Sequence, residues 1–157
     1  LPPPSSSPSS SSILMYSIMT TSRKDCLASF DNHAHYAAAH GYGVVKFLLD
    51  EDAFPVHWNG FAMNSTKSLK FVLALEMMRN RVADTYIWID CDVVFTNMEH
   101  RWEDVLAMGR GAALILPRDM SYMLKEPEQE LVNTGIVIMR PGPGGGRDRL
   151  NSTENWA

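Results

Sequence analysis

The sequence has little positive charge, and this excludes one broad class of partners. Its 14 Lys and Arg are outnumbered by 18 Asp and Glu, which gives a net charge of −4. Proteins that bind the phosphate backbone of nucleic acids depend on surfaces rich in Lys and Arg. The composition offers no such surface, so we expect no nucleic acid among the partners.

The sequence also lacks the long apolar run of a membrane span. A spanning helix takes roughly 18–20 consecutive apolar residues, whereas the apolar segment ILMYSIM (13–19) has the length of a strand. There is no signal peptide and no initiator Met, and the sequence stops at ENWA. We interpret it as a fragment, so that any membrane anchor would precede Leu1 and any further strand or ligand would follow Ala157.

Cysteine is scarce as well. Cys26 and Cys91 are the only two, and neither a CxxC pair nor the Cys/His spacing of a zinc site is present. Two cysteines make no disulfide framework, and they do not indicate a cellular compartment.

Composition divides the chain into three segments. Residues 1–12 are almost entirely Pro and Ser, which predicts a disordered linker or stem. Residues 13–140 carry the apolar patterns of one packed domain, in a chain that is 45% hydrophobic. Residues 141–157 predict a Gly-rich flexible tail, because PGPGGGR lacks the Gly-Lys-Ser/Thr ending of a phosphate-binding loop.

Strand and helix patterns alternate through 13–140. Helical spacing begins after Thr21 or Ser22 as a cap and ends at His40, before Gly41. The segment 50–64, with Pro55 and Gly60, predicts a loop. The alternation predicts an α/β domain with a largely parallel sheet, whose ligands gather at the carboxyl ends of the strands. We expect strands at 13–19, 42–49, 86–90, 112–117 and 131–140, and further helices at 65–80 and 100–108.

The segment TYIWIDCDVVFTN (85–97) contains the strongest chemical signal. Its apolar strand ends on Asp90 and Asp92, and burying two carboxylates without a positive partner is costly. A divalent cation would neutralise them, and oxygen ligands suit Mg²⁺ or Mn²⁺ shared with the phosphates of a substrate.

Two other interpretations of the aspartates remain open at this point. Phosphatases of the haloacid-dehalogenase type also end a strand on Asp-x-Asp, and Asp90 would then be the nucleophile and Asp92 the general acid. That motif is normally on the first strand of its domain, whereas two strand-helix units precede it here. The remaining alternative is an inactive fragment in which both aspartates are solvated.

Other polar residues are weaker candidates. His33 and His35 are two apart on the predicted helix and therefore do not face each other as metal ligands would. His33 and His40 share a face, which we interpret as packed or exposed. Lys67 and Lys70 lie on one face of the helix at 65–80 and are either phosphate ligands or solvated.

Four stretches in order resemble one enzyme family. They are NHAHYAAAHGY (32–42), KFVLALEMM (70–78), YIWIDCDVVFTNME (86–99) and VNTGIVIMR (132–140). The sequence resembles the galactosyl-, xylosyl- and mannosyltransferases that include plant xyloglucan xylosyltransferases and fungal Golgi α-1,6-mannosyltransferases. The resemblance implies a GT-A fold, in which Asp-x-Asp holds Mn²⁺ or Mg²⁺ against the diphosphate of a nucleotide sugar.

The resemblance also implies roles for particular residues. Asp90 and Asp92 would bind metal and diphosphate, with Cys91 near the ribose. Lys70 aligns with the family's lysine. The nucleotide-sugar site would further include Thr20 and Thr21 near the base or ribose, and Asn133, Thr134 and Gly135 around the acceptor or sugar.

The expected reaction transfers a hexose or pentose from a nucleotide-sugar donor, with UDP favoured over GDP, to a glycan hydroxyl. The resemblance implies a type II membrane protein in the Golgi or another secretory lumen, anchored from outside this chain. The family's metal histidine follows NTG, whereas all five histidines of this sequence precede it.

Overall fold

The computed structural model describes residues 12–50, 52, 54–63, 65–118 and 132–141. A five-stranded sheet in the order β2-β1-β5-β7-β6 forms its centre. Strand β1 is parallel to β2 and β5, and β7 is antiparallel to both β5 and β6. All strands of this sheet except β7 therefore point the same way, as predicted. Its strands are β1 (Ile13–Thr20), β2 (Gly43–Leu49), β5 (Thr85–Ile89), β6 (Leu114–Ile115) and β7 (Ile136–Met139).

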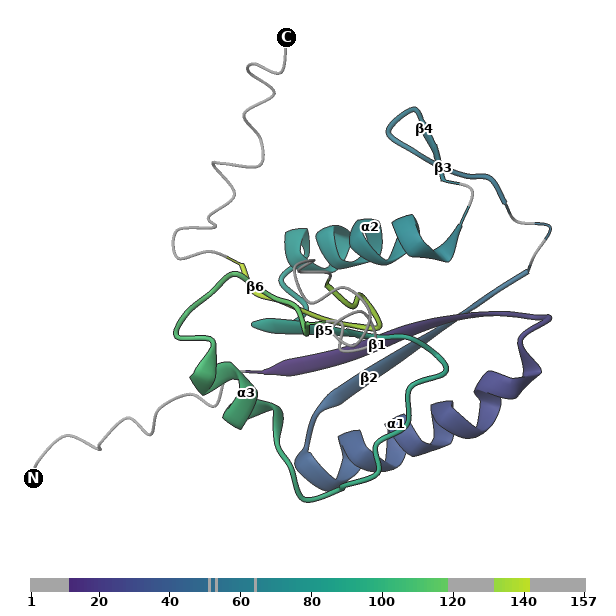
Figure 1. Cartoon of the computed structure of the whole chain (residues 1–157). Helices are drawn as coiled ribbons and strands as arrows, with labels where there is room; N and C mark the ends of the chain where they lie inside the picture. The colour runs from purple at the N-terminus through teal and green to yellow at the C-terminus, as the bar shows by residue number, and fades with distance from the viewer. Residues whose placement is uncertain (1–11, 51, 53, 64, 119–131, 142–157) are drawn as a thin grey trace, which may run out of the picture.

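Helices cover both faces of the sheet (Figure 1). They are α1 (Leu27–His40), α2 (Thr66–Arg79) and α3 (Trp102–Met108), and a short 3-10 helix, η1 (Lys24–Cys26), precedes α1. Tyr16, Tyr86 and Trp88 pack with α2 on one face, whereas Met15 and Ile87 pack with α1 and α3 on the other. Side chains alternate between the two faces along each strand, and this explains why the central strands are apolar throughout.

The central strands hold most of the core. Ile87, Ile89 and Val137 are fully buried, and each such side chain contributes about 1.5–3 kcal/mol relative to exposure. No helix among the described residues has the length and apolar character to cross a membrane.

The first helix begins later than predicted. Neither Thr21 nor Ser22 caps it: α1 starts at Leu27 after η1, and no side chain caps its first turn. The predicted end is correct, because Gly41 has a φ of 73° and its N–H donates to the carbonyls of Ala37 and Ala38. The left-handed conformation favours glycine, which has no Cβ to clash.

The predicted loop at 50–64 contains a hairpin. Strands β3 (Val56–Trp58) and β4 (Phe61–Met63) pair antiparallel across Asn59 and Gly60, with φ values of 46° and 82°. Asn-Gly with two positive φ values is the preferred two-residue hairpin turn. The dipeptide was visible in the sequence, but each flanking strand is only three residues long.

The two cysteines form a disulfide, which the sequence analysis did not expect. Cys26 and Cys91 are 65 residues apart in sequence, and their Cα atoms are 5.2 Å apart. Cys26 lies in η1, just after β1, and Cys91 follows β5. Because β1 and β5 are parallel neighbours, their carboxyl ends meet at one edge and bring the sulfurs together.

Candidate functional site

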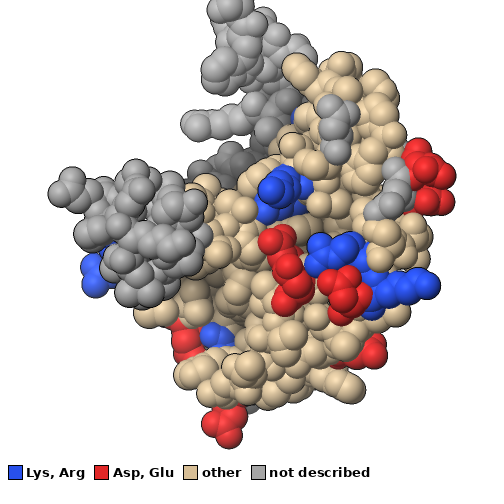
Figure 2. All heavy atoms as spheres, turned by 45° about the vertical axis from the view of Figure 1, so that its right-hand side comes forward, with Lys and Arg blue, Asp and Glu red and all other residues tan. Residues whose placement is uncertain are grey.

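Asp90 and Asp92 lie at the carboxyl edge of the sheet, where β5 ends. They border a cleft of about 230 Å³. Figure 2 shows a face of the molecule on which acidic and basic side chains lie close together. Strands β1 and β5, helix α2, the turn after β1 and the turn before β7 all contribute to its wall. Its lining residues are Ile18, Arg23, Thr66, Lys67, Lys70, Trp88, Asp90, Cys91, Asp92 and Thr134.

Asp90 is half-buried and held from several directions. The indole N–H of Trp88 donates to Oδ1 over 2.6 Å, and the backbone N–H of Asp90 donates to the carbonyl of Gly135 over 2.7 Å. Its carbonyl accepts from the N–H of Val93. A Cβ at Gly135 would lie 3.4 Å from Oδ2 and 2.9 Å from Oδ1 of Asn133, so glycine leaves the space this turn needs.

Asp92 is more exposed than Asp90. Its carboxylate lies 3.8 Å from the guanidinium of Arg23, and both side chains are about half exposed or more, at 65% and 47%. Arg23 also bonds Asp25 over 3.0 Å, and that hydrogen bond is the main reason why its pKa is raised. Exposed pairs of this kind are weak and exchange readily, so both Asp92 and Arg23 are available to a ligand.

Lys70 is the one buried charge of the cleft wall among the described residues. Its Nζ donates to the carbonyl of Thr134 over 2.7 Å and lies 5.3 Å from the centroid of the Trp88 ring. Burial lowers the pKa of Lys70, and the negative charge of Asp90 opposes that shift. The lysine thus stands beside the carboxylate, as its place in the sequence suggested, while Lys67 lies on the same wall with its side chain exposed.

Thr20 and Thr21 lie at the same edge of the sheet but outside the cleft lining. The hydroxyls of Thr20 and Ser22 are 3.2 Å apart, and Thr21 donates to Asp50 after β2 over 3.4 Å. Any contact of these threonines with a ligand would therefore lie beyond the aspartate cleft, toward β2.

The remaining predicted residues serve the turns around the cleft. Oδ1 of Asn133 accepts from the N–H of Gly135 over 2.7 Å, so this side chain orders the turn before β7. Thr134 borders the cleft. Cys91 does so as well, but its sulfur is in the disulfide, so it has no thiol to offer a ribose.

Two histidines of α1 form hydrogen bonds with the backbone of the segment that follows Asp92. The Nε2 atom of His33 lies 2.7 Å from the carbonyl of Val93, and that of His40 lies 2.8 Å from the carbonyl of Met98. The side-chain amide of Asn32 donates to the carbonyl of Phe95 and accepts from the backbone N–H of the same residue. His33 is buried and His35 exposed, so the packed interpretation holds for His33.

The carboxylate oxygens of Asp90 and Asp92 suit a divalent cation such as Mg²⁺ or Mn²⁺, provided that a substrate supplies further ligands. Among the described residues, no group of three or more His, Cys, Asp or Glu side chains could hold a metal. Two carboxylates provide oxygen ligands of the kind Mg²⁺ and Mn²⁺ prefer, and such ions commonly keep waters and bind substrate phosphates. Asp90 and Asp92 therefore fit a cation shared with a phosphate ligand.

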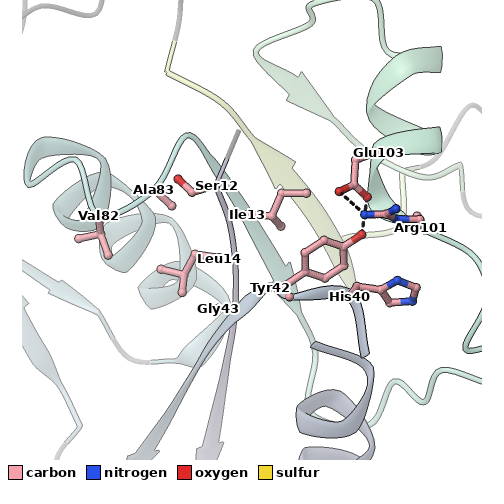
Figure 3. Close-up of a pocket in the computed structure, with 11 residues that line it drawn as sticks. Ser12, Ile13, Leu14, His40, Tyr42, Gly43, Val82, Ala83, Arg101 and Glu103 are labelled. Atoms are coloured by element: carbon pink, nitrogen blue, oxygen red, sulfur yellow. Dashed lines mark hydrogen bonds and ion pairs between the residues drawn. The ribbon is translucent and has the colours of Figure 1, made fainter. Parts of the chain in front are cut away.

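A second cavity, of about 350 Å³, lies at the opposite edge of the sheet (Figure 3). Glu103 in its wall accepts hydrogen bonds from Tyr42 and Arg101, so these polar groups satisfy one another. The aspartate cleft, by contrast, combines two carboxylates with three cations that could meet an anion, and we take it as the functional site.

Sequence reasoning missed four residues of the cleft: Ile18, Arg23, Thr66 and Trp88. Arg23 lies just before the short helix η1, which the pattern did not predict. Ile18 and Thr66 lie in a correctly predicted strand and helix, but the pattern did not show that they face the cleft. Trp88 belonged to the quoted motif, but the strand pattern identified it only as core.

Comparison with solved structures shows a fold that the chain shares with another protein. No family model and no curated protein matches the chain. A solved structure described as a glycosyltransferase involved in the glycosylation of the major capsid of PBCV-1 matches with a TM-score of 0.55 and 12% identity. The match covers 82% of this chain and 60% of that one. The chain has the fold of a glycosyltransferase.

This likeness confirms the predicted fold class. At 12% identity it concerns the fold alone, and the chain spans about 60% of the length of that glycosyltransferase.

Proposed function

We propose that this chain carries the donor site of a glycosyltransferase. The enzyme would move a hexose or pentose from a nucleotide sugar, with UDP favoured over GDP, to a glycan hydroxyl. The observation that supports this most strongly is the position of Asp90 and Asp92. In a glycosyltransferase fold, they end a central strand in a cleft that also contains Arg23, Lys67 and Lys70.

The charges of the cleft fit a nucleoside diphosphate bound with a metal ion. Asp90 and Asp92 would hold Mn²⁺ or Mg²⁺, which as a Lewis acid stabilises the negative charge of a departing diphosphate. Lys67 and Arg23 have exposed side chains in the cleft wall and would bind phosphate oxygens. The ammonium group of Lys70 already donates a hydrogen bond to the carbonyl of Thr134, so it would contribute its positive charge and line the cleft without binding phosphate directly.

The two other interpretations receive less support. A phosphatase that uses Asp90 as nucleophile needs further carboxylates for its magnesium, and the described residues bring no third one to the pair. An inactive fragment leaves the grouping of three cations around two carboxylates without a role. Trapping by beryllium fluoride would distinguish the phosphatase, because the fluoride complex mimics a phosphoaspartate at Asp90.

The disulfide supports a secretory location. Disulfides form and persist mainly in oxidising compartments, such as the lumen of the secretory pathway, and this one joins two elements at the site itself. We therefore propose the Golgi or another secretory lumen, with membrane attachment through a segment outside this chain.

A donor screen tests the proposed activity. The chain is incubated with Mn²⁺ and a panel of UDP- and GDP-hexoses and pentoses, and released nucleotide is measured with and without oligosaccharide acceptors. We expect release from one nucleotide class, its loss with a chelator, and its loss in Asp92→Asn.

Asp31→Ala is the control, since it removes an exposed carboxylate of α1 that does not line the cleft. Release that is equal in Asp92→Asn and the unmodified chain would contradict the proposal.

A further inference from the structure

Trp88 links the core of the sheet to one of the two aspartates. Its side chain is only 2% exposed, and its indole N–H donates to Oδ1 of Asp90 over 2.6 Å. The two residues are two apart at the end of β5, so their side chains lie on the same face of the strand. Buried indole N–H groups normally find an acceptor, and here the acceptor is a proposed metal ligand.

The ring of Trp88 has little freedom to turn. Tyr16 packs against it edge to face, with ring centroids 5.3 Å apart, and Nζ of Lys70 lies 5.3 Å from its centroid. These neighbours are fixed in turn, because Tyr16 donates to the carbonyl of Lys70 over 2.9 Å and Lys70 donates to that of Thr134. The direction of the indole N–H is therefore set by the packed core.

The two oxygens of the Asp90 carboxylate have different surroundings. Oδ1 is occupied by the indole, whereas Oδ2 has no hydrogen-bond donor among the described residues and lies near Gly135. A carboxylate held by one oxygen presents the other in a fixed direction. Such outer partners of a ligand typically change metal affinity by about 10–100-fold when removed.

We propose that Trp88 is a positioning residue of the site, whose indole N–H fixes Asp90 so that Oδ2 is presented to the divalent cation. The inference rests on the proposed function, since it concerns the same metal. It adds a residue that acts on the metal through Asp90.

The chain supplies a matched control in Trp102. This tryptophan of α3 is also buried, at 7% exposure, but its indole N–H has no partner in the part of the chain that the structure describes. Trp88→Phe and Trp102→Phe both replace a buried indole by a smaller ring. Only Trp88→Phe removes a hydrogen bond to a carboxylate.

The first experiment measures Mn²⁺ affinity in the presence of UDP, from the electron paramagnetic resonance signal of free Mn²⁺. Urea unfolding confirms that each variant is folded under the conditions used. We expect Trp88→Phe to weaken Mn²⁺ binding about 10-fold or more and Trp102→Phe to leave it within about twofold of the unmodified chain.

The outcomes separate the inference from the function. Equal affinity in Trp88→Phe and the unmodified chain would overturn the role of Trp88 and leave the proposed function standing. Equal losses in both variants would overturn it too, because they would indicate a general packing effect. No Mn²⁺-dependent binding in the unmodified chain would overturn the proposed function and this inference with it.

A second readout needs neither metal nor nucleotide. In nitrogen-15 NMR spectra, Asp90→Ala should shift the indole N–H resonance of Trp88 and speed its exchange with solvent, while that of Trp102 stays in place. An unchanged Trp88 resonance would mean that the hydrogen bond is absent and would overturn the inference directly.

Discussion

At the scale of single residues, His33 shows how α1 supports the site without lining it. Its ring is buried between the helix and the segment after Asp92, and its Nε2 lies 2.7 Å from the carbonyl of Val93. Burial lowers its pKa, and Lys46 adds to this shift while the bond to Val93 opposes it. The folded protein therefore keeps His33 neutral at pH values where an unfolded chain already protonates it.

The lowered pKa of His33 predicts a pH dependence of stability. At pH values between the lowered pKa of folded His33 and the ordinary histidine pKa of about 6.5, the unfolded chain binds more protons than the folded one. The free energy of unfolding therefore rises with pH through this window and falls as the pH is lowered. We expect His33→Gln, which cannot titrate, to show a smaller loss of stability from pH 7 to pH 5 in urea unfolding.

His35→Gln is the matched control, because His35 lies on the same helix with an exposed side chain. It should retain the pH dependence of the unmodified chain. A steep pH dependence that persists in His33→Gln would show that another group is responsible.

Individual site residues differed in how well the sequence revealed them. Asp90 and Asp92 were found because two carboxylates after an apolar strand are costly unless something neutralises them. Lys67 and Lys70 were both candidates because they share one helix face, and the family resemblance singled out Lys70. Arg23 was missed because an arginine in a turn has no pattern, and it joins the site only through the fold of η1.

At the scale of elements, the disulfide connects the turn after β1 to the turn after β5. Cys91 sits between the two aspartates, so the covalent link fixes the backbone that carries both. The sequence could not reveal this pairing, because only the adjacency of β1 and β5 brings residues 65 positions apart into contact.

Loss of the disulfide should cost stability. The chain-entropy estimate for a loop of this length is about 4 kcal/mol. We expect Cys26→Ser/Cys91→Ser, or the unmodified chain in dithiothreitol, to lose stability of that order in urea unfolding. Dithiothreitol should not affect the double variant. Two free thiols in the native, unreduced chain would contradict the pairing.

The elements themselves were largely predictable. Short continuous apolar runs predicted the strands of the sheet, and apolar residues at helical spacing predicted the helices, in the right order. The direction of β7 was not readable, because a hydrophobic pattern does not record which way a strand runs. The hairpin of β3 and β4 was missed because its two short strands have too few residues to show a period.

At the scale of the whole molecule, charge is distributed unevenly. The net charge is −4, yet one cleft at the carboxyl edge gathers Arg23, Lys67 and Lys70 around Asp90 and Asp92. The fold produces this grouping, since parallel neighbours end at a common edge. The sequence indicated that ligands bind at the carboxyl edge of the sheet, but it could not show which turns come together at that edge.

Calorimetric titration of UDP and GDP into the chain, with Mn²⁺ and then with a chelator, tests the central claim most directly. Asp90→Ala/Asp92→Ala and the control Asp31→Ala are measured alongside. The account expects binding of one nucleotide that requires Mn²⁺, is lost in the double variant and is unchanged in the control. Binding that persists in the double variant or in chelator, or no binding to the folded chain, would contradict it.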